Sequence, residues 1–341
     1  MNQRMSIIFM ITEKCNCKCF FCSRNNLSKL YHEPTYHDCC KAFDILAVEY
    51  PHSKLIISGG EPTLSKNFFP ILDYVSDKFE KVEVQTNGTF GRDVADKLIM
   101  YLSKNVFIQF SIDGMEDVHD AIRGKGTFKK VVDNIGYMQN FNSRLSISST
   151  VTSTNMSDIL ALSEYLNGLQ FRRLTVSYVQ PLDPLTEKIM SAATWNSFVD
   201  QLLVRCFYRV DVSKLYAFDL MEKFLESGET WHGIANCGRG VTHFYVSPTF
   251  DVLPCTCTNQ RIGNLLVDNI RKIKNRLAAK ERVHIHSKSI CNNCKYLPIC
   301  NGGCPGLSLK VFNMDNMGDV RCPLVYDFAT SNGYIPQDNI L

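Results

Sequence analysis

The chain has 341 residues, of which 45% are hydrophobic and 21% are charged, a globular composition with room for one large domain or two medium ones. Its net charge of +3 is too small to indicate nucleic-acid binding by itself. No apolar run approaches the roughly 20 residues of a membrane helix, and the first residues lack the cleavage site of a signal peptide, so we expect a cytoplasmic protein.

Strands and helices alternate along the first 180 residues. The patterns predict strands at 6–12, 54–60, 81–88, 105–114, 144–152 and 172–180, and helices at 38–50, 67–79, 93–103, 127–140 and 156–169. Such repetition predicts a parallel α/β fold with right-handed crossovers. Six units are too few to close an eight-stranded barrel, so we expect a partial (β/α)6 TIM-like barrel over residues 1–180.

The rest of the chain has a different character. Residues 181–230 read as a linker, PLDPLTEK, followed by two helices. Residues 231–341 are rich in cysteine, short strands and turns, and form a second domain that looks too small to rest on an apolar core alone. Bound metal clusters would supply the missing stabilisation.

Fifteen cysteines are unusual for a cytoplasmic chain, where disulfides are rare and close spacing indicates metal ligation. Cys39, Cys40 and Cys206 lie in helix-like apolar patterns and read as ordinary buried thiols. The segment EKCNCKCFFCSR places Cys15, Cys19 and Cys22 in a C-x3-C-x2-C pattern, which can hold three irons of a [4Fe–4S] cluster and leave the fourth open. Cys17 could instead complete a four-cysteine zinc site, although C-x-C-x-C is a strained way to build a tetrahedron.

The cysteine loop resembles the one that follows the first strand in the radical S-adenosylmethionine (SAM) family, with Phe21 as the aromatic residue before the last cysteine. The resemblance implies that the open iron chelates SAM, that one electron cleaves SAM to a 5′-deoxyadenosyl radical, and that this radical abstracts a hydrogen atom from a substrate. Cys15, Cys19 and Cys22 would then be the cluster ligands, and Cys17 an extra thiol.

Motifs at other strand ends extend the resemblance. GGEP (Gly59, Gly60, Glu61 and Pro62) is similar to the family motif that contacts the SAM amino group, and its glycines permit close backbone approach. QTNG, with Asn87, and SIDG, with Ser111 and Asp113, match places where the family binds the ribose and the methionine end. Arg123 is a candidate partner of the SAM carboxylate, with a solvated surface charge as the alternative. Further candidates on the fifth strand are Ser148 and Thr150.

The carboxyl-terminal cysteines resemble the SPASM extension, which carries two auxiliary iron–sulfur clusters, expected here as [4Fe–4S]. A pair of zinc sites is the alternative. The resemblance assigns the distal auxiliary cluster to Cys291, Cys294, Cys300 and Cys322. It assigns the proximal cluster to Cys237, Cys255 and Cys304. The fourth proximal position is open: His243 ligates, Cys257 ligates, or one iron is free.

Family members of this type mostly modify peptides or protein side chains. Sulfatase-maturing members have an aspartate after the second proximal cysteine, and Thr256 stands there in this chain, which argues against that activity. We therefore expect an oxidoreductase that matures a ribosomally made precursor peptide through a carbon–carbon, ether or thioether cross-link, with a cyclophane as the specific guess. A side-chain-oxidising maturase, a small-molecule-modifying enzyme and a structural zinc protein are the alternatives.

The sequence gives less information about the protein partners and the catalytic base. We expect a reductase such as flavodoxin or ferredoxin to supply the electron. Because the first strand begins near residue 6, we expect the leader peptide to be held by the barrel rim and second domain, or by a separate leader-binding protein. Candidate bases are Tyr178, Asp251 and His243, by position alone.

Overall fold

The computed structural model describes residues 5–22, 33–180, 188–227, 237–258, 260–280 and 284–336. Its strands are β1 (Ser6–Met10), β2 (Lys54–Ser58), β3 (Lys81–Thr86), β4 (Val106–Ser111), β5 (Leu145–Val151), β6 (Leu174–Tyr178), β7 (Val210–Asp211), β8 (His243–Val246), β9 (Asp251–Leu253) and β10 (Gly263–Asn264). Its α-helices are α1 (Tyr36–Glu49), α2 (Phe68–Ser76), α3 (Arg92–Leu102), α4 (Glu116–Arg123), α5 (Thr127–Met138), α6 (Met156–Tyr165), α7 (Ala192–Arg205), α8 (Phe218–Ser227), α9 (Ile270–Ala278), α10 (Leu297–Cys300), α11 (Pro305–Phe312) and α12 (Pro323–Ser331). Short 3-10 helices are η2 (Pro62–Leu64), η3 (Gln139–Arg144), η4 (Leu166–Gly168) and η5 (Ile290–Asn293).

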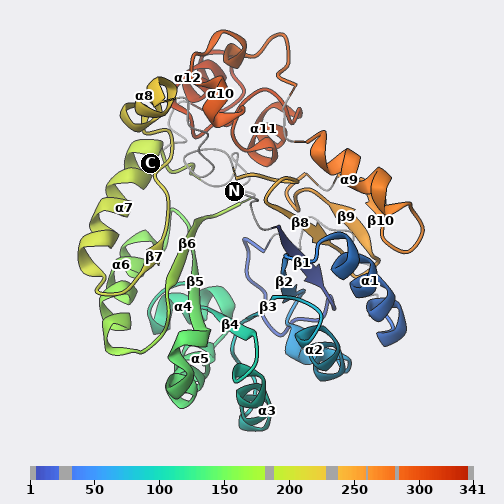
Figure 1. Ribbon diagram of the computed structural model, residues 1–341. Helices are drawn as coiled ribbons and strands as arrows, with labels where there is room; N and C mark the ends of the chain where they lie inside the picture. The colour runs from blue at the N-terminus through green and yellow to red at the C-terminus, as the bar shows by residue number, and fades with distance from the viewer. Residues whose placement is uncertain are drawn as a thin grey trace.

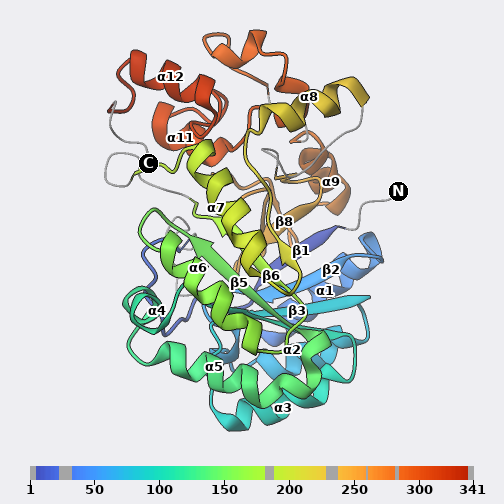
Figure 2. The same ribbon diagram turned by 90° about the vertical axis from the view of Figure 1, so that its left-hand side faces the viewer.

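The expected α/β barrel architecture is confirmed. Strands β1 to β6 are parallel and adjacent in chain order, and helices α1 to α7 lie outside them (Figure 1). The six strands and five helices predicted from periodicity are all present, most of them shorter by one to four residues at one end or the other. The ring of strands does not close on itself, because the order of the sheet begins at β10 and ends at β7. In the side view of Figure 2, α8, α11 and α12 lie at one end of the molecule and α3 and α5 at the other.

The core lies between the strands and the outer helices. Alternate strand residues such as Ile7, Leu55 and Val84 are fully buried on that side. The opposite, inner face carries several polar side chains, and Gln85 on β3 donates to Gln109 on β4 across it (3.0 Å). Because parallel strands end at one edge of the sheet, the loops that follow them meet there and form the site.

Helix α4 was missed in the sequence, between the fourth strand and the helix expected at 127–140. Its eight residues, EDVHDAIR, hold three apolar side chains, those of Val118, Ala121 and Ile122, and the buried residue of the helix is His119. A helix of just over two turns is shorter than the window of about 11 residues over which helical periodicity is recognised. It carries Arg123 in its last turn and so belongs to the site.

The carboxyl-terminal part continues the barrel sheet. Strand β8 pairs in parallel with β1, with Ile7 opposite Phe244, and β9 and β10 follow it antiparallel. At the other edge β7 pairs with β6. The expectation of mainly strands and turns beyond residue 231 was incomplete, because α9, α11 and α12 are helical. Residues 181–187 and 228–236 lie outside the described residues, so the domain boundaries stay predictions.

Within the described residues, no helix has the length and apolar character needed to cross a membrane.

Candidate active site

The cysteine loop begins directly after β1 and is fixed by neighbouring loops. The Gly60 N–H donates to the Thr12 carbonyl (2.8 Å), and the Glu61 N–H donates to the Lys14 carbonyl (2.7 Å). On the other side, Asn87 Nδ2 donates to Asn16 Oδ1 (2.7 Å). The loop is thereby attached to the ends of β2 and β3, at the carboxyl edge of the sheet.

Three of the loop sulfurs lie together. Cys17 is buried and shares hydrogen bonds with the side chains of Cys15 and Cys19. Its hydrogen bond is the largest cause that lowers the pKa of Cys19 to about 7. Asn87 Nδ2 also donates to Cys17 Sγ (3.3 Å). Cys22 is held by the backbone, where its N–H donates to the Cys19 carbonyl (3.2 Å).

Glu61 lies at the centre of the strand-end loops and is 1% exposed. Its Oε1 accepts from the N–H and hydroxyl of Thr63 (3.2 and 2.7 Å) and from the hydroxyl of Thr86 (2.8 Å), while Oε2 accepts from the Asn87 N–H (2.7 Å). Burial raises its pKa despite these donors. Each carboxylate oxygen has two lone pairs, and Oε2 has one donor, so Oε2 can accept from one further donor.

Asp113 and Arg123 form a buried ion pair beyond β4. Asp113 is fully buried, its Oδ2 accepts from Arg123 Nε (2.6 Å), and its Oδ1 accepts from the Thr150 N–H (2.7 Å). Burial by itself would lower the pKa of the Arg123 guanidinium, but the negative charge of Asp113 contributes most to raising it, and the pKa is raised overall. The Arg123 charge also contributes to the low pKa of Cys19, so this cation lies near the cysteine loop. The Arg123 side chain is 11% exposed, so it is largely buried and is not a solvated surface charge.

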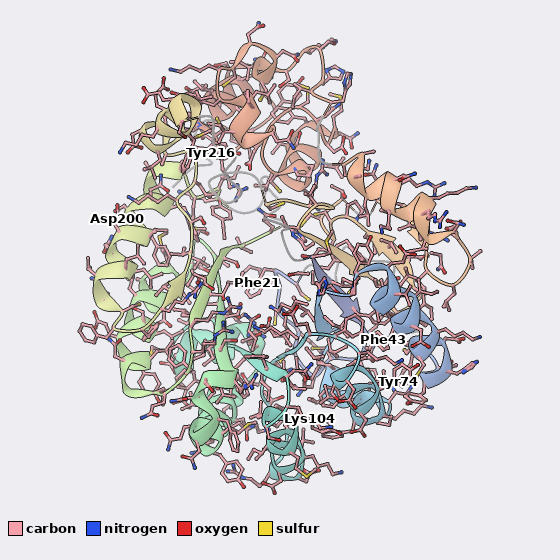
Figure 3. All side chains as sticks on the ribbon, viewed as in Figure 1. Phe21, Phe43, Tyr74, Lys104, Asp200 and Tyr216 are labelled. Carbon is pink, nitrogen blue, oxygen red and sulfur yellow. The ribbon has the colours of Figure 1, made fainter. Side chains whose placement is uncertain are left out.

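The remaining candidates surround the same edge. A Cβ added to Gly59, which has φ +145°, would lie 2.4 Å from the Thr12 carbonyl oxygen, so only glycine fits there. Pro62 starts η2, and Ser111 pairs in register with Ser148 on the neighbouring strand. Phe21 is labelled in Figure 3 on the inner side of the strands, among the loops of this edge.

Two of the candidate bases are engaged by the protein itself. The Tyr178 hydroxyl accepts from the Met190 N–H and donates to the Met190 carbonyl (3.0 and 3.1 Å), and burial raises its pKa. Asp251 Oδ1 accepts from Asn264 Nδ2 (2.8 Å) and pairs with Arg261 (3.0 Å). Both contacts favour structural roles for these side chains.

The four cysteines expected at the distal cluster line one cavity. Cys291, Cys294, Cys300 and Cys322 share its wall with apolar residues such as Met221. Cys291 lies in η5 and Cys294 just after it, Cys300 ends the neighbouring α10, and Cys322 comes later in the chain, just before α12. Tyr216, labelled in Figure 3, also lines this cavity.

The proximal cysteines gather beside the end of β6. Cys304 Sγ lies 3.3 Å from Gln180 Oε1, and Cys257 Sγ lies 3.9 Å from the same oxygen. The Cys257 N–H donates to Cys255 Sγ (3.2 Å). Cys237 influences the pKa of Cys304, which burial raises to about 12. Within the described residues, no three His, Cys, Asp or Glu side chains surround one point as they would to hold a single metal ion.

Comparison with known proteins identifies the barrel. Residues 9–166 match the radical SAM superfamily. They form a radical SAM domain. That family implies SAM and a [4Fe–4S] cluster as cofactors.

Two relatives of this radical SAM enzyme are similar over most of its length. It is 24% identical to the antilisterial bacteriocin subtilosin biosynthesis protein AlbA of Bacillus subtilis over 91% of this chain and 69% of the relative. It is 28% identical to the mycofactocin maturase MftC of Mycobacterium ulcerans over 86% of this chain and 81% of the relative. The solved structure of Streptococcus suis SuiB bound to precursor peptide SuiA has the same fold, with a TM-score of 0.74, 15% identity, and 95% and 76% of the two chains covered.

The residues of the radical SAM enzyme fit both family cofactors. The thiol of Cys19, near that of Cys15 and close to the largely buried guanidinium of Arg123, suits an anionic, thiolate-ligated cluster. Gly59, which has no side chain, and Glu61 Oε2, which can accept from one further donor, suit a ligand that approaches the backbone with an ammonium group.

Sequence reasoning missed several residues of the radical SAM enzyme's site. His119 accepts from the Asp113 N–H through Nδ1 (3.2 Å). Gln180 and Arg239 lie beside the proximal cysteines. Asp319 and Arg321 form a fully buried pair (2.6 Å) whose carboxylate accepts from the Cys304 N–H. For Arg239, Asp319 and Arg321, the available signal was a place only a few residues from a predicted cysteine ligand. The direction in which each of these side chains points depends on the fold.

Proposed function

We propose that this radical SAM enzyme is a SPASM-type maturase that acts on a ribosomally made precursor peptide. It would abstract a hydrogen atom from a side-chain or α carbon and leave a carbon–carbon, ether or thioether cross-link, with a cyclophane as the specific guess. The observation that carries the proposal is the extent of similarity: AlbA and MftC match 91% and 86% of this chain, so the likeness includes the cysteine-rich part.

The amino-terminal loop would hold the reactive centre through Cys15, Cys19 and Cys22. A [4Fe–4S] cluster bound there would supply the electron that cleaves SAM to a 5′-deoxyadenosyl radical. Glu61, with one acceptor site left, would receive the SAM ammonium beside the Gly59 backbone. Arg123 would attract the SAM carboxylate with the guanidinium nitrogens that Asp113 does not use, because Asp113 engages Nε.

Other residues of the same edge would complete the SAM pocket. Their proposed part is to contact the adenosine and methionine ends and to exclude water from them. They are Phe21, Gly60, Pro62, Asn87, Ser111, Ser148 and Thr150.

The cysteine-rich part would hold two auxiliary clusters. A distal cluster would be held by Cys291, Cys294, Cys300 and Cys322, the four that line one cavity. A proximal cluster would be held by Cys237, Cys255 and Cys304, with a fourth ligand considered below. A cross-link formed after loss of one hydrogen atom leaves one further electron and proton to remove, and an auxiliary cluster would supply the acceptor for that electron.

The proposed organisation is a barrel over residues 1–180, a helical linker over 181–230 and an auxiliary-cluster domain over 231–341. A reductase such as flavodoxin or ferredoxin would supply electrons, in the cytoplasm. The leader of the precursor would be held by the barrel rim and second domain, or by a separate leader-binding protein.

Co-expression tests the proposal most directly. Each short peptide encoded beside the gene would be produced with the chain and, separately, with the Cys15/Cys19/Cys22→Ala variant. We expect one peptide to lose two hydrogens when it is produced with the wild-type chain and to stay unmodified with the variant. Its fragment mass spectrum should lack backbone cleavages over the stretch that the cross-link spans.

Other outcomes of the co-expression separate the alternatives. Loss of two hydrogens without a protected stretch would indicate side-chain oxidation of the sulfatase-maturase kind. Unmodified peptides, together with 5′-deoxyadenosine formation dependent on a small metabolite, would contradict the peptide proposal in favour of a small-molecule enzyme.

A further inference from the structure

The fourth ligand of the proximal auxiliary cluster is decided by how Cys257 is held. Cys257 Sγ and Cys304 Sγ both contact Gln180 Oε1, at 3.9 and 3.3 Å. Cys255 is joined to Cys257 through the Cys257 N–H and through a side-chain hydrogen bond between the two sulfurs. One amide oxygen from the end of β6 therefore marks a point around which three cysteines gather.

Packing directs Cys257 toward this point. Cys304 is the N-cap of α11, and Gly306 lies in the first turn of that helix. A Cβ added to Gly306 would lie 2.4 Å from Cys257 Cβ, so the helix start approaches Cys257 closely because residue 306 has no side chain. Cys257 is thus held against the same helix end that presents Cys304.

A buried cation independently indicates that an anion binds here. Arg239 is 8% exposed, and its Nη1 has no hydrogen-bond partner among the described residues. Its charge acts on the thiols of Cys237 and Cys255, so it faces the cysteine group. A buried guanidinium N–H without a partner is costly, and a thiolate-ligated iron–sulfur cluster is an anion of the sort that would satisfy it.

His243 is held by its neighbours at the start of β8. Its Nδ1 lies 3.2 Å from the Thr242 hydroxyl, and its ring packs edge-on against Tyr245 at 5.8 Å. It lies at the start of β8, opposite Ser6 at the start of β1, which is the edge of the barrel away from the strand-end loops. Further along the same strand, burial raises the pKa of Tyr245, and the nearby thiols of Cys255, Cys257 and Cys237 raise it further.

We infer that Cys257 is the fourth ligand of the proximal cluster, which Cys237, Cys255, Cys257 and Cys304 close as a [4Fe–4S] site without an open iron. The inference rests on the proposed auxiliary clusters. A closed site carries electrons and does not bind substrate, so the peptide would meet only the SAM radical. With all four sulfurs ionised, the Gln180 amide would turn to donate its N–H to them, beside Arg239.

The test uses the full-length Cys15/Cys19/Cys22→Ala variant, reconstituted anaerobically, so that iron reports on the auxiliary clusters alone. Into this parent we would introduce Cys257→Ala and, as the matched control, His243→Ala. Iron and sulfide content, Mössbauer spectra and EPR spectra would be compared. We expect Cys257→Ala to lose about one-eighth of the iron with a three-iron EPR signal, or about half if the cluster is lost, and His243→Ala to match the parent.

Each other outcome has a defined meaning. An unchanged Cys257→Ala spectrum overturns the inference, in favour of His243 if that variant alone changes and of an open iron if neither does. The distal-cluster component serves as the folding control. If Cys257→Ala also loses the distal-cluster component, the variant Cys257→Ser decides. A serine ligand keeps the iron count and shifts the spectrum of the proximal cluster. An unshifted spectrum contradicts the inference. A parent without iron would overturn the proposed auxiliary clusters themselves.

Discussion

At the scale of single residues, the site depends on buried polar groups whose partners come from different loops. Glu61 was found from the GGEP motif, but its four donors were not, because Thr86 and Asn87 reach it only through the pairing of β2 with β3. Arg123 and Asp113 were both found from motifs, and their ion pair was not. A motif gives the residue type and its place after a strand, whereas its hydrogen bonds depend on tertiary structure.

His119 gives a prediction about pH. Burial, followed by repulsion from Arg123, lowers its pKa to about 4 from an ordinary value of 6.5, and its neutral Nδ1 accepts from the Asp113 N–H. Above pH 6.5 the imidazole is neutral in both states and its contribution is complete. As pH falls from 6.5 toward 4, the unfolded state takes up a proton that the folded state does not, so stability falls, by about 1 kcal/mol at pH 5.5.

The variant His119→Asn keeps an acceptor for the Asp113 N–H and does not titrate in this range. Urea unfolding of wild type and variant at pH 7.5 and 5.5 measures the difference. We expect the wild type to lose about 1 kcal/mol more than the variant between these two values. Equal losses would show that His119 does not titrate as its burial implies.

At the scale of elements, periodicity found the barrel because its strands and helices each bury one face. The same signal failed for α4, which buries little, and for α11 and α12, which follow Cys304 and Cys322 and start with proline. In those two helices, ligand spacing dominates the sequence and hides the apolar pattern. The proline directly after each cysteine was an available helix-start signal.

Two glycines in different elements should respond oppositely to alanine. At Gly59, with φ +145°, a Cβ would meet the Thr12 carbonyl, so Gly59→Ala should lower the free energy of unfolding by about 1–3 kcal/mol. At Gly136, inside α5, a Cβ meets nothing within 4 Å, so Gly136→Ala should raise it by about 0.5–1 kcal/mol. Urea unfolding of both variants checks this, and a Gly59→Ala protein as stable as wild type would show that the β2 loop can move.

At the scale of the whole molecule, the cysteine-rich part is continuous with the barrel through β8 and β1 (Figure 1). Sequence analysis predicted a separate domain from the change in composition near residue 231. It could not predict this pairing, because it joins residues 6–9 to residues 243–246 and depends on no local signal. Gln180, which follows β6, also contacts the proximal Cys304, so the carboxyl edge of the sheet meets the proposed electron acceptor.

The central claim is that the amino-terminal loop holds a SAM-cleaving cluster distinct from two auxiliary ones. The most direct test counts iron and sulfide in anaerobically reconstituted wild type and in the Cys15/Cys19/Cys22→Ala variant, with Mössbauer spectra of each. We expect three clusters to fall to two and 5′-deoxyadenosine formation to cease, since Cys17 by itself cannot replace three ligands. Zinc in place of iron, or an unchanged iron count in the variant, would contradict the account.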